Sequence, residues 1–407
     1  MPAASIACPF CGLVCDDMIL DGDRVDTRGC AKGAAGFARR GGALAHRVAG
    51  APATLAEASA AAAGLLGKAR LPLITGVGAD LAGIRALLTL ADRLGAVVDR
   101  WQSAAQLANL AVVQRAGALA ATFGEIANRA DVVLLLGGDP ARDHPRFFER
   151  LLRNRKPLYR STPWVAFLGP EAEAPADPAV SERLLLGADR MIDGLSMLAA
   201  LLGRRRTGAA AGLPHAALGA LAERLRGARY GAIVWETAAF AAVEREAITT
   251  LVLQLLRIAT LETRCVGLPL GGAGNAQGVS QAMLWQAGWP GRLSFANGVP
   301  VHDPWLYDAE RLIAAGEADA LLWVASLAPV PPPAAAPPTV AFVSADTALS
   351  GVPAVEIRVG VPGIDHPGTM MRADTIVALP LAASRPSDLP SVAAAAAAIL
   401  ERLDAAP

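Results

Sequence analysis

Residues 130–140 read Ala130-Asp131-Val132-Val133-Leu134-Leu135-Leu136-Gly137-Gly138-Asp139-Pro140. A short run of apolar residues follows an acidic residue here and ends at a glycine-rich turn. Such a run indicates a strand that is buried on both faces. Strands of this kind belong to parallel sheets that are covered by helices. We therefore predict an α/β fold in which residues 131–136 form one strand of a largely parallel sheet.

The same pattern extends outward in both directions along the chain. Residues 81–94 carry apolar side chains at three- and four-residue spacing, which predicts a helix, and residues 391–403 predict a terminal helix. Alternation of short strands with helical stretches indicates βαβ units. Further strands are expected at residues 71–76, 96–98, 230–235, 264–266, 320–324, 339–343, 355–359 and 375–379.

Length and charge narrow the class of protein. The chain has 407 residues, 37 basic against 37 acidic side chains, and a hydrophobic fraction of 53%. This length suggests two to three domains. The balanced charge argues against a partner that is a nucleic acid or a membrane surface. The N-terminus has no basic region typical of a signal peptide, so we expect a cytoplasmic protein.

Four of the five cysteines lie within the first 30 residues, with the spacing Cys8-x2-Cys11-x3-Cys15-x14-Cys30. In a cytoplasmic chain this crowding favours a metal site over disulfides. A hairpin over residues 18–26 would bring the last cysteine beside the first three. Four thiolates suit an iron–sulfur cluster or zinc; four buried free thiols are the alternative. Cys265 stands alone and is expected in the core.

Two glycine-rich turns could hold a ligand or could simply be structural. Residues 271–278 lie between a strand and a helix, where backbone amides can approach a phosphate. Residues 137–140 end a strand, where open α/β sheets bind ligands. His302 and His366 could be site residues or structural ones. Three tryptophans close together in sequence indicate either core or a partner surface: Trp285, Trp289 and Trp305.

Taken in order, these motifs resemble the B-type subunit of formylmethanofuran dehydrogenase, a member of the molybdopterin oxidoreductase superfamily. The resemblance covers nearly the whole chain. Its motifs are Cys-Pro-Phe-Cys-x3-Cys-Asp-Asp at 8–17, Gly-Cys-Ala-Lys-Gly at 29–33, the strand–helix unit ending at 95–99, Asn-Arg-Ala-Asp-Val-Val at 128–133, the turn 137–140, His-Pro-Arg at 144–146, Gly-Asn-Ala-Gln-Gly at 274–278 and Gly-Glu-Ala-Asp-Ala-Leu at 316–321.

The resemblance implies both a cluster site and a cofactor cleft. In that family four N-terminal cysteines hold a [4Fe-4S] cluster, which here would use Cys8, Cys11, Cys15 and Cys30; zinc is the alternative. The family also binds a pterin cofactor. The positions that match its cleft, vestigial here and either empty or filled by the protein's own loops, are Gly137, Gly138, Asp139, His144, Gly274 and Asn275.

One expected metal ligand is absent. The family's tungsten or molybdenum is bound by two pterins and by one cysteine in the loop after residues 95–99. In this chain Ala105 stands at that cysteine and Gln106 at the adjacent histidine. A methyl group cannot bind a metal, and an amide cannot carry protons as an imidazole does. No tungsten or molybdenum pterin is therefore expected.

The missing ligand is typical of the formyltransferase/hydrolase complex of methylotrophic bacteria. That complex transfers a formyl group from tetrahydromethanopterin to a methanofuran-type carrier and releases formate in one-carbon metabolism. The resemblance implies a structural, redox-inactive subunit that binds an amidohydrolase-type, a formyltransferase-type and a third scaffold subunit. Two alternatives stay open: an active tungsten or molybdenum enzyme that uses another ligand, such as His144, and a zinc-knuckle binding module.

The expected architecture is molybdopterin-oxidoreductase-like. A small Cys-rich domain at 1–50 precedes two Rossmann-like parallel-sheet domains. One of these is split between 51–121 and 291–407, and the other spans 122–290.

Overall fold

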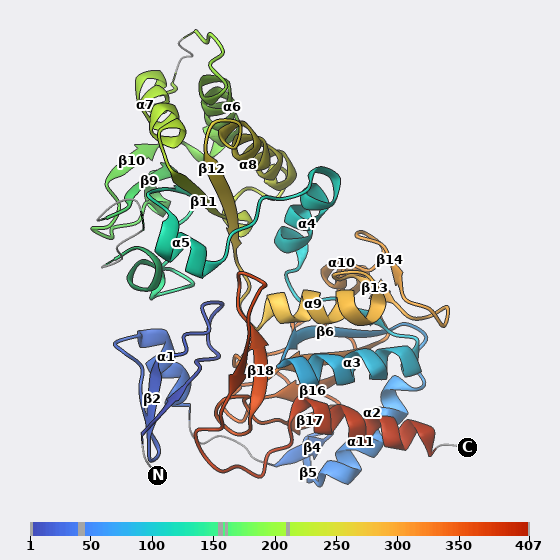
Figure 1. The fold of residues 1–407 in the computed structure, drawn as a ribbon. Coiled ribbons are helices and arrows are strands. Elements are labelled where there is room, and N and C mark those ends of the chain that lie inside the picture. The colour runs from blue at the N-terminus through green and yellow to red at the C-terminus, as the bar shows by residue number, and fades with distance from the viewer. Residues whose placement is uncertain (1–2, 40–44, 154–157, 159–161, 209–211, 406–407) are drawn as a thin grey trace. The chain divides into compact units, whose positions relative to one another are not determined.

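The computed structural model describes residues 3–39, 45–153, 158, 162–208 and 212–405 (Figure 1). The chain forms two compact units: unit 1 comprises Met1–Ser103 and Gly272–Pro407, and unit 2 comprises Ala104–Gly271. Residues 40–44 of the predicted Cys-rich domain lie outside the described residues. Within the described ranges, no helix combines the length and apolar character needed to cross a membrane.

The N-terminal part of unit 1 contains a small antiparallel sheet and one helix. The sheet has the order β1 (Ala4–Ile6), β2 (Met18–Asp21), β3 (Arg24–Asp26), and helix α1 spans Ala31–Phe37. The predicted hairpin is confirmed as β2–β3, and Gly22 adopts φ +62° in its turn. Phe10 and Phe37 pack edge to face with ring centroids 5.1 Å apart.

Unit 1 is built on a nine-stranded mixed sheet. Its five inner strands are parallel, and the strands at each end are antiparallel. Their order is β14 (Val301–His302), β13 (Leu293–Ser294), β7 (Val97–Val98), β6 (Pro72–Gly78), β15 (Ala320–Ala325), β16 (Thr339–Val343), β17 (Val355–Arg358), β4 (His46–Val48) and β5 (Ala51–Ala53).

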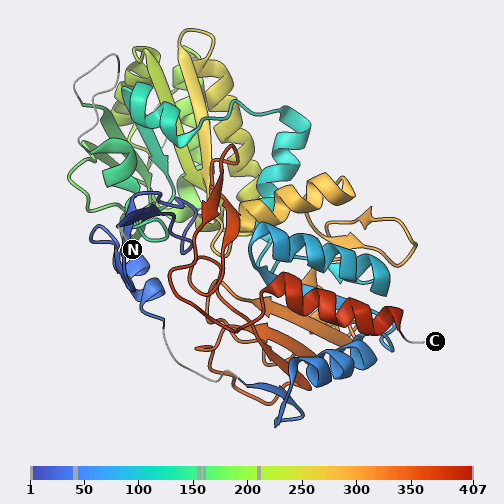
Figure 2. The same cartoon turned by 60° about the horizontal axis from the view of Figure 1, so that its bottom comes forward.

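Helices cover both faces of this sheet. One face packs against α2 (Leu55–Leu66), α3 (Leu81–Leu94), α9 (Ala276–Ala287) and α11 (Val392–Asp404), and α3 and α11 lie side by side in Figure 2. The other face packs against α10 (Ala309–Ala314). An apolar core lies on each face of the sheet. Alternate residues of each strand contribute to one core or the other, because side chains along a strand point to opposite faces.

Unit 2 is built on a five-stranded sheet that is parallel throughout. Its order is β10 (Glu182–Leu185), β9 (Trp164–Gly169), β8 (Val132–Leu136), β11 (Tyr230–Glu236) and β12 (Arg264–Leu270). The helices are α4 (Ala104–Ala116), α5 (Phe123–Arg129), α6 (Met191–Leu202), α7 (His215–Arg226) and α8 (Arg245–Ala259); the short turns are η1 (Phe148–Leu152), η2 (Glu171–Glu173), η3 (Ala188–Arg190) and η4 (Thr237–Ala239).

The predicted α/β class with parallel sheets is confirmed, and α3 occupies the predicted residues 81–94. One strand prediction is wrong. Residues 375–379 do not form a parallel strand, because Thr375 adopts φ +63° in a turn where Arg372 pairs with Asp374. The chain instead forms an antiparallel hairpin of β18 (Gly368–Met371) and β19 (Ala378–Leu381).

The two units divide the chain at other points than the predicted domains. Helix α4 belongs to unit 2, where Val112 joins the core and Arg115 pairs with Glu246. Helix α9 belongs to unit 1, where Val279 and Met283 join the core of the nine-stranded sheet.

Candidate functional site

In unit 2 the strand order reverses between β8 and β11, which is where open α/β sheets bind ligands. Gly137 follows β8 with φ +84°, and a Cβ atom placed on it would lie 2.3 Å from the ring of Phe240. Phe240 is buried. The cavity that remains beside Gly138 and Glu236 measures ≈ 10 Å³, about the space of one water molecule. The protein's own aromatic ring therefore occupies the crevice at Gly137.

Hydrogen bonds within the loop after β8 fix its conformation. The Asp139 carboxylate accepts the backbone N–H of Ala141 at 2.9 Å. The buried His144 donates its backbone N–H to Pro140 O at 3.0 Å, and its carbonyl accepts Phe147 N–H at 2.8 Å. Gly137, Gly138, Asp139 and His144 thus lie in one loop region of unit 2. The other two predicted cleft residues, Gly274 and Asn275, belong to unit 1.

In unit 1 the corresponding reversal lies between β6 and β15. Asn275, at φ +61°, donates its side-chain amide to Ala79 O at 2.9 Å and accepts Met371 N–H at 3.1 Å. Ser326, after β15, donates its hydroxyl to Gly78 O at 2.8 Å. Asn275 therefore ties together the loop after β6, the start of α9 and the β18–β19 hairpin, and both ends of its amide are used in doing so.

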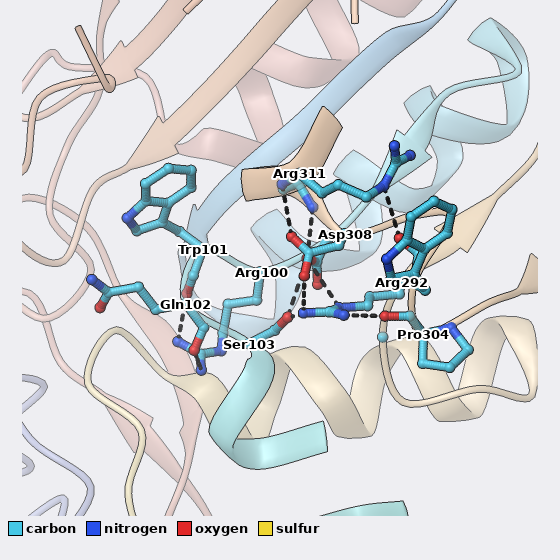
Figure 3. A network of polar contacts seen from close by, with 12 residues as sticks. Arg100, Trp101, Gln102, Ser103, Arg292, Pro304, Asp308 and Arg311 are labelled. Carbon is cyan, nitrogen blue, oxygen red and sulfur yellow. Dashed lines mark hydrogen bonds and ion pairs between the residues drawn. The ribbon is translucent and has the colours of Figure 1, made fainter. Parts of the chain in front are cut away.

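A buried charge network lies at the carboxyl end of β7 (Figure 3). The Arg292 guanidinium lies 3.5 Å from Asp99 Oδ2 and 2.6 Å from Asp308 Oδ2, and it donates to the Pro304 carbonyl. Ser103 Oγ donates to Asp99 at 3.1 Å and accepts from Arg292 at 3.2 Å. The network therefore fixes the loop after β7, residues 99–103, to the segment 292–308.

Burial governs the electrostatics of this loop. It raises the pKa of Asp99 to about 6, against the opposing effects of Arg292, Ala309 N–H and Ser103. Among the described residues Asp99 Oδ1 has no hydrogen-bond partner. Burial also lowers the pKa of Arg100, whose guanidinium donates to the carbonyls of Trp101 and Gln102. The loop thus combines a carboxyl group that protonates easily with a partly buried cation.

The four N-terminal cysteines lie in one small region of unit 1. Cys8, Cys15 and Cys30 are buried and Cys11 is partly so. Burial raises the pKa of Cys8, and the nearby Cys11, Cys15 and Cys30 thiols raise it further. Backbone N–H groups point at the sulfurs, as where Gly33 N–H donates to Cys30 Sγ at 3.4 Å.

The thiol donor set suits an iron–sulfur cluster or zinc. Within the described residues, however, no three His, Cys, Asp or Glu side chains are arranged so that they could hold a metal ion. The donors are suitable, but they are not gathered at ligand distance.

The remaining candidates contact backbone carbonyls or lie in the core. His302 Nδ1 lies 2.7 Å from Gly291 O, and His366 Nδ1 lies 2.8 Å from Pro367 O. Cys265 is buried on β12, and burial raises its pKa to about 12. Its predicted place in the core is confirmed.

Similarity to a known protein establishes the family of this chain. The sequence is 32% identical to the B-type subunit of the formyltransferase/hydrolase complex Fhc of Methylorubrum extorquens over 380 residues, which are 88% of this chain and 97% of the relative. The chain belongs to the family of B-type formyltransferase/hydrolase complex subunits. No family model matches the sequence.

A solved structure supports this assignment. The crystal structure of the formyltransferase/hydrolase complex from Methylorubrum extorquens with methylofuran contains a chain that matches with a TM-score of 0.76 and 30% identity. The match covers 88% of this B-type subunit and 99% of that chain.

Two more distant relatives carry tungsten in their names. Both are B-type subunits of a tungsten-containing formylmethanofuran dehydrogenase 2, from Methanocaldococcus jannaschii (26% identical, 79% of this chain and 78% of the relative) and Methanococcus maripaludis (26% identical, 91% and 92%). In the present B-type subunit Ala105 is the second residue of α4 and offers only a methyl group. The nearby Ser103 hydroxyl is engaged by Asp99 and Arg292. These residues do not fit a tungsten or molybdenum centre.

Sequence reasoning missed the network of Asp99, Arg292 and Asp308. Its members are far apart in sequence and belong to no motif, so their proximity depends on the sheet order that places β13 beside β7. The only local signal was the acid directly after the strand at 96–98.

Proposed function

We propose that this B-type subunit is a structural, redox-inactive member of a formyltransferase/hydrolase complex. The complex would transfer a formyl group from tetrahydromethanopterin to a methanofuran-type carrier and release formate. The proposal is supported by the 32% identity to the Methylorubrum extorquens protein and by the fold match to the complex solved with methylofuran. The partners would be an amidohydrolase-type, a formyltransferase-type and a third scaffold subunit.

The observation that carries the redox-inactive role is Ala105. It stands where the tungsten relatives are expected to use a cysteine, and it offers only a methyl group, while the nearby Ser103 hydroxyl is engaged by Asp99 and Arg292. The surroundings of Gly137 and Asn275 favour the same conclusion. The Phe240 ring fills the space beside Gly137, and the side-chain amide of Asn275 is already hydrogen-bonded to the Ala79 and Met371 backbone, so neither residue is open to a pterin.

We further propose that the sheets of both units derive from Rossmann-like domains. If the strands of unit 2 are numbered by their order in the sequence, they lie across the sheet in the order 3-2-1-4-5. This is the strand order of doubly wound dinucleotide-binding folds. The inner strands of unit 1 follow the flavodoxin-like order, with the second strand outside the first. Gly137, Gly138, Asp139, His144, Gly274 and Asn275 would then be remnants of a pterin cleft. The cytoplasmic location stays a prediction from the sequence.

We propose that Cys8, Cys11, Cys15 and Cys30 bind a [4Fe-4S] cluster, with zinc as the alternative metal. Metal binding would draw the four thiols together and stabilise a region whose apolar core is small. Iron, zinc and labile-sulfide determination on protein prepared without oxygen tests this. About four irons and four sulfides per chain are expected; stoichiometric zinc without sulfide would identify the alternative, and absence of both metals would refute the site.

The complex itself provides the test of function. Co-purification with the three other subunits, together with formyl transfer and formate release, is expected for the assembly. Elemental analysis is expected to find tungsten and molybdenum far below one atom per chain. Oxidation of formylmethanofuran, or a stoichiometric content of either metal, would establish the active-dehydrogenase alternative. A chain that binds zinc and no partner protein would instead be a zinc-knuckle module.

A further inference from the structure

The segment of unit 1 between residues 284 and 306 exposes large apolar side chains. The stacking of Trp289 on His302 and the hydrogen bond from Arg292 to the Pro304 carbonyl bring its two ends together. Of the tryptophans, which all lie in the described part of the chain, three are exposed, and all three are here; Trp285 is 61% exposed and Trp305 is 65% exposed. Apolar neighbours of the same segment are exposed with them. We call this set the tryptophan surface: Leu284, Trp285, Trp289, Val299, Trp305 and Leu306.

Two of the three exposed rings, those of Trp289 and Trp305, are held in position by neighbouring side chains although solvent reaches them. Trp289 stacks on His302 with ring centroids 5.1 Å apart and an interplanar angle of 17°. The Arg311 guanidinium lies 4.6 Å from the centroid of Trp305 and donates to the carbonyls of Trp305 and Leu306. Rings that are already ordered lose little conformational entropy when a partner covers them.

The segment that carries these rings is anchored from beneath by the charge network of Figure 3. Arg292 is buried at φ +49°, a conformation unfavourable for a residue with a side chain. Its guanidinium binds Asp99, Asp308 and the Pro304 carbonyl. These contacts tie residue 292 to residues 304–308 and to the loop after β7. The network therefore presents a preformed platform.

We propose that the tryptophan surface is the docking site for another subunit of the complex, an inference that rests on the proposed function. Exposed apolar patches of this kind mark interaction sites, and tryptophan is enriched among residues that dominate binding energy. The partner would present an apolar face with carbonyl acceptors for the indole N–H groups.

The charge at the edge of the tryptophan surface favours another subunit of the complex over a lipid surface or a second copy of this chain. Residues 303–317 contain four acids, of which Asp308 pairs with Arg292 and Glu317 pairs with Arg311. The four acids and two bases leave a net charge of −2, contributed by Asp303 and Glu310. Hydrogen bonds from Leu306 and Trp305 N–H lower the pKa of Asp303, so this carboxylate is ionised. An acidic edge repels anionic lipid. It also disfavours a symmetric pair of copies, in which equal charges would face each other. A partner with basic residues around an apolar centre fits.

The test uses the full chain, co-produced with the other subunits, in the double variant W285A/W305A. We expect binding at least about thirty-fold weaker, since removing one dominant interface residue has an effect of this size. The matched control V243A/L261A removes two exposed apolar side chains of unit 2 and is expected to bind as wild type. Both variants alone should keep the wild-type unfolding midpoint.

Oxidative footprinting of the wild type avoids substitution altogether. Modification of Trp285 and Trp305 is expected to fall several-fold on assembly, while that of Leu261 stays unchanged. Equal binding by the tryptophan variant, or unchanged modification, overturns the proposal. Dimerisation of the isolated chain that the double variant abolishes would also overturn it, in favour of self-association. A wild-type chain that never co-purifies with the other subunits would instead refute the proposed function.

Discussion

Arg292 forms ion pairs with two carboxylates, the buried Asp99 and the largely buried Asp308. In Arg292→Met, Asp99 and Asp308 lose their guanidinium partner, and breaking a buried ion network of this kind costs about 3–5 kcal/mol. We expect a clearly lower thermal unfolding midpoint. The control Arg204→Met removes an exposed ion pair with Glu262 and should leave the midpoint unchanged. Equal behaviour of the two variants would contradict a structural role for the network.

Asp99 makes folding stability fall as the pH rises through the acid range. Its pKa is raised to about 6 in the fold, against about 3.9 in an unfolded chain. Between these values the folded protein holds a proton that the unfolded chain has released. Stability should therefore drop by about 2 kcal/mol from pH 4 to pH 7.

The control for this pH dependence is Asp99→Asn, which stays neutral at every pH. Urea unfolding at pH 4.5 and pH 7 measures it. The stability of the wild type relative to the variant is expected to be higher at the lower pH. If the two proteins change in parallel, the raised pKa of Asp99 is wrong.

At the scale of elements, Asn275 joins three parts of unit 1 through one amide. Asn275→Gly keeps the φ of +61° accessible but loses two hydrogen bonds, which should cost about 2 kcal/mol. Asn275→Ala loses the same bonds and adds left-handed backbone strain of about 1 kcal/mol. Denaturant unfolding should rank wild type above Gly and Gly above Ala. An Ala variant as stable as Gly would show that the strain has no effect.

Elements whose signals are local were predictable. The helix at 81–94 has apolar periodicity, the Asp80 side chain as N-cap and Gly95 at φ +63° as its C-cap. The terminal helix has Ser391 as its N-cap. The buried strand at 131–136 is one residue shorter than predicted, because Asp131 instead accepts the backbone N–H of Tyr230.

Elements and site features that depend on distant pairing were not predictable. The edge strands β4, β5, β13 and β14 have only two or three residues each and form because a neighbour is present. The segment 375–379 has the composition of a strand, but Thr375 turns the chain and pairs it with β18. The Asp99–Arg292 contact likewise follows from the sheet order. The six residues predicted for the cleft divide between the two units, which no local motif could reveal.

At the scale of the whole molecule, unit 2 is continuous in sequence and has its own core and its own parallel sheet. We expect a fragment of residues 104–271 to fold alone, with cooperative thermal unfolding by circular dichroism. The control is the fragment 1–103, which lacks β15, β16 and β17 and should stay unfolded. A disordered 104–271 fragment would show that unit 2 depends on the rest of the chain.

The insertion of unit 2 into unit 1 sets the order in which a ribosome can complete the molecule. Strand β6 leaves the ribosome early, yet its neighbour β15 begins only at Ala320, after all of unit 2. At roughly 5–20 residues per second this delay is on the order of ten seconds or more. During that time unit 2 can fold while Leu73, Ile74 and Val77 have no finished sheet to cover them. The nascent N-terminal segment is therefore a natural client for chaperones that hold exposed apolar strands.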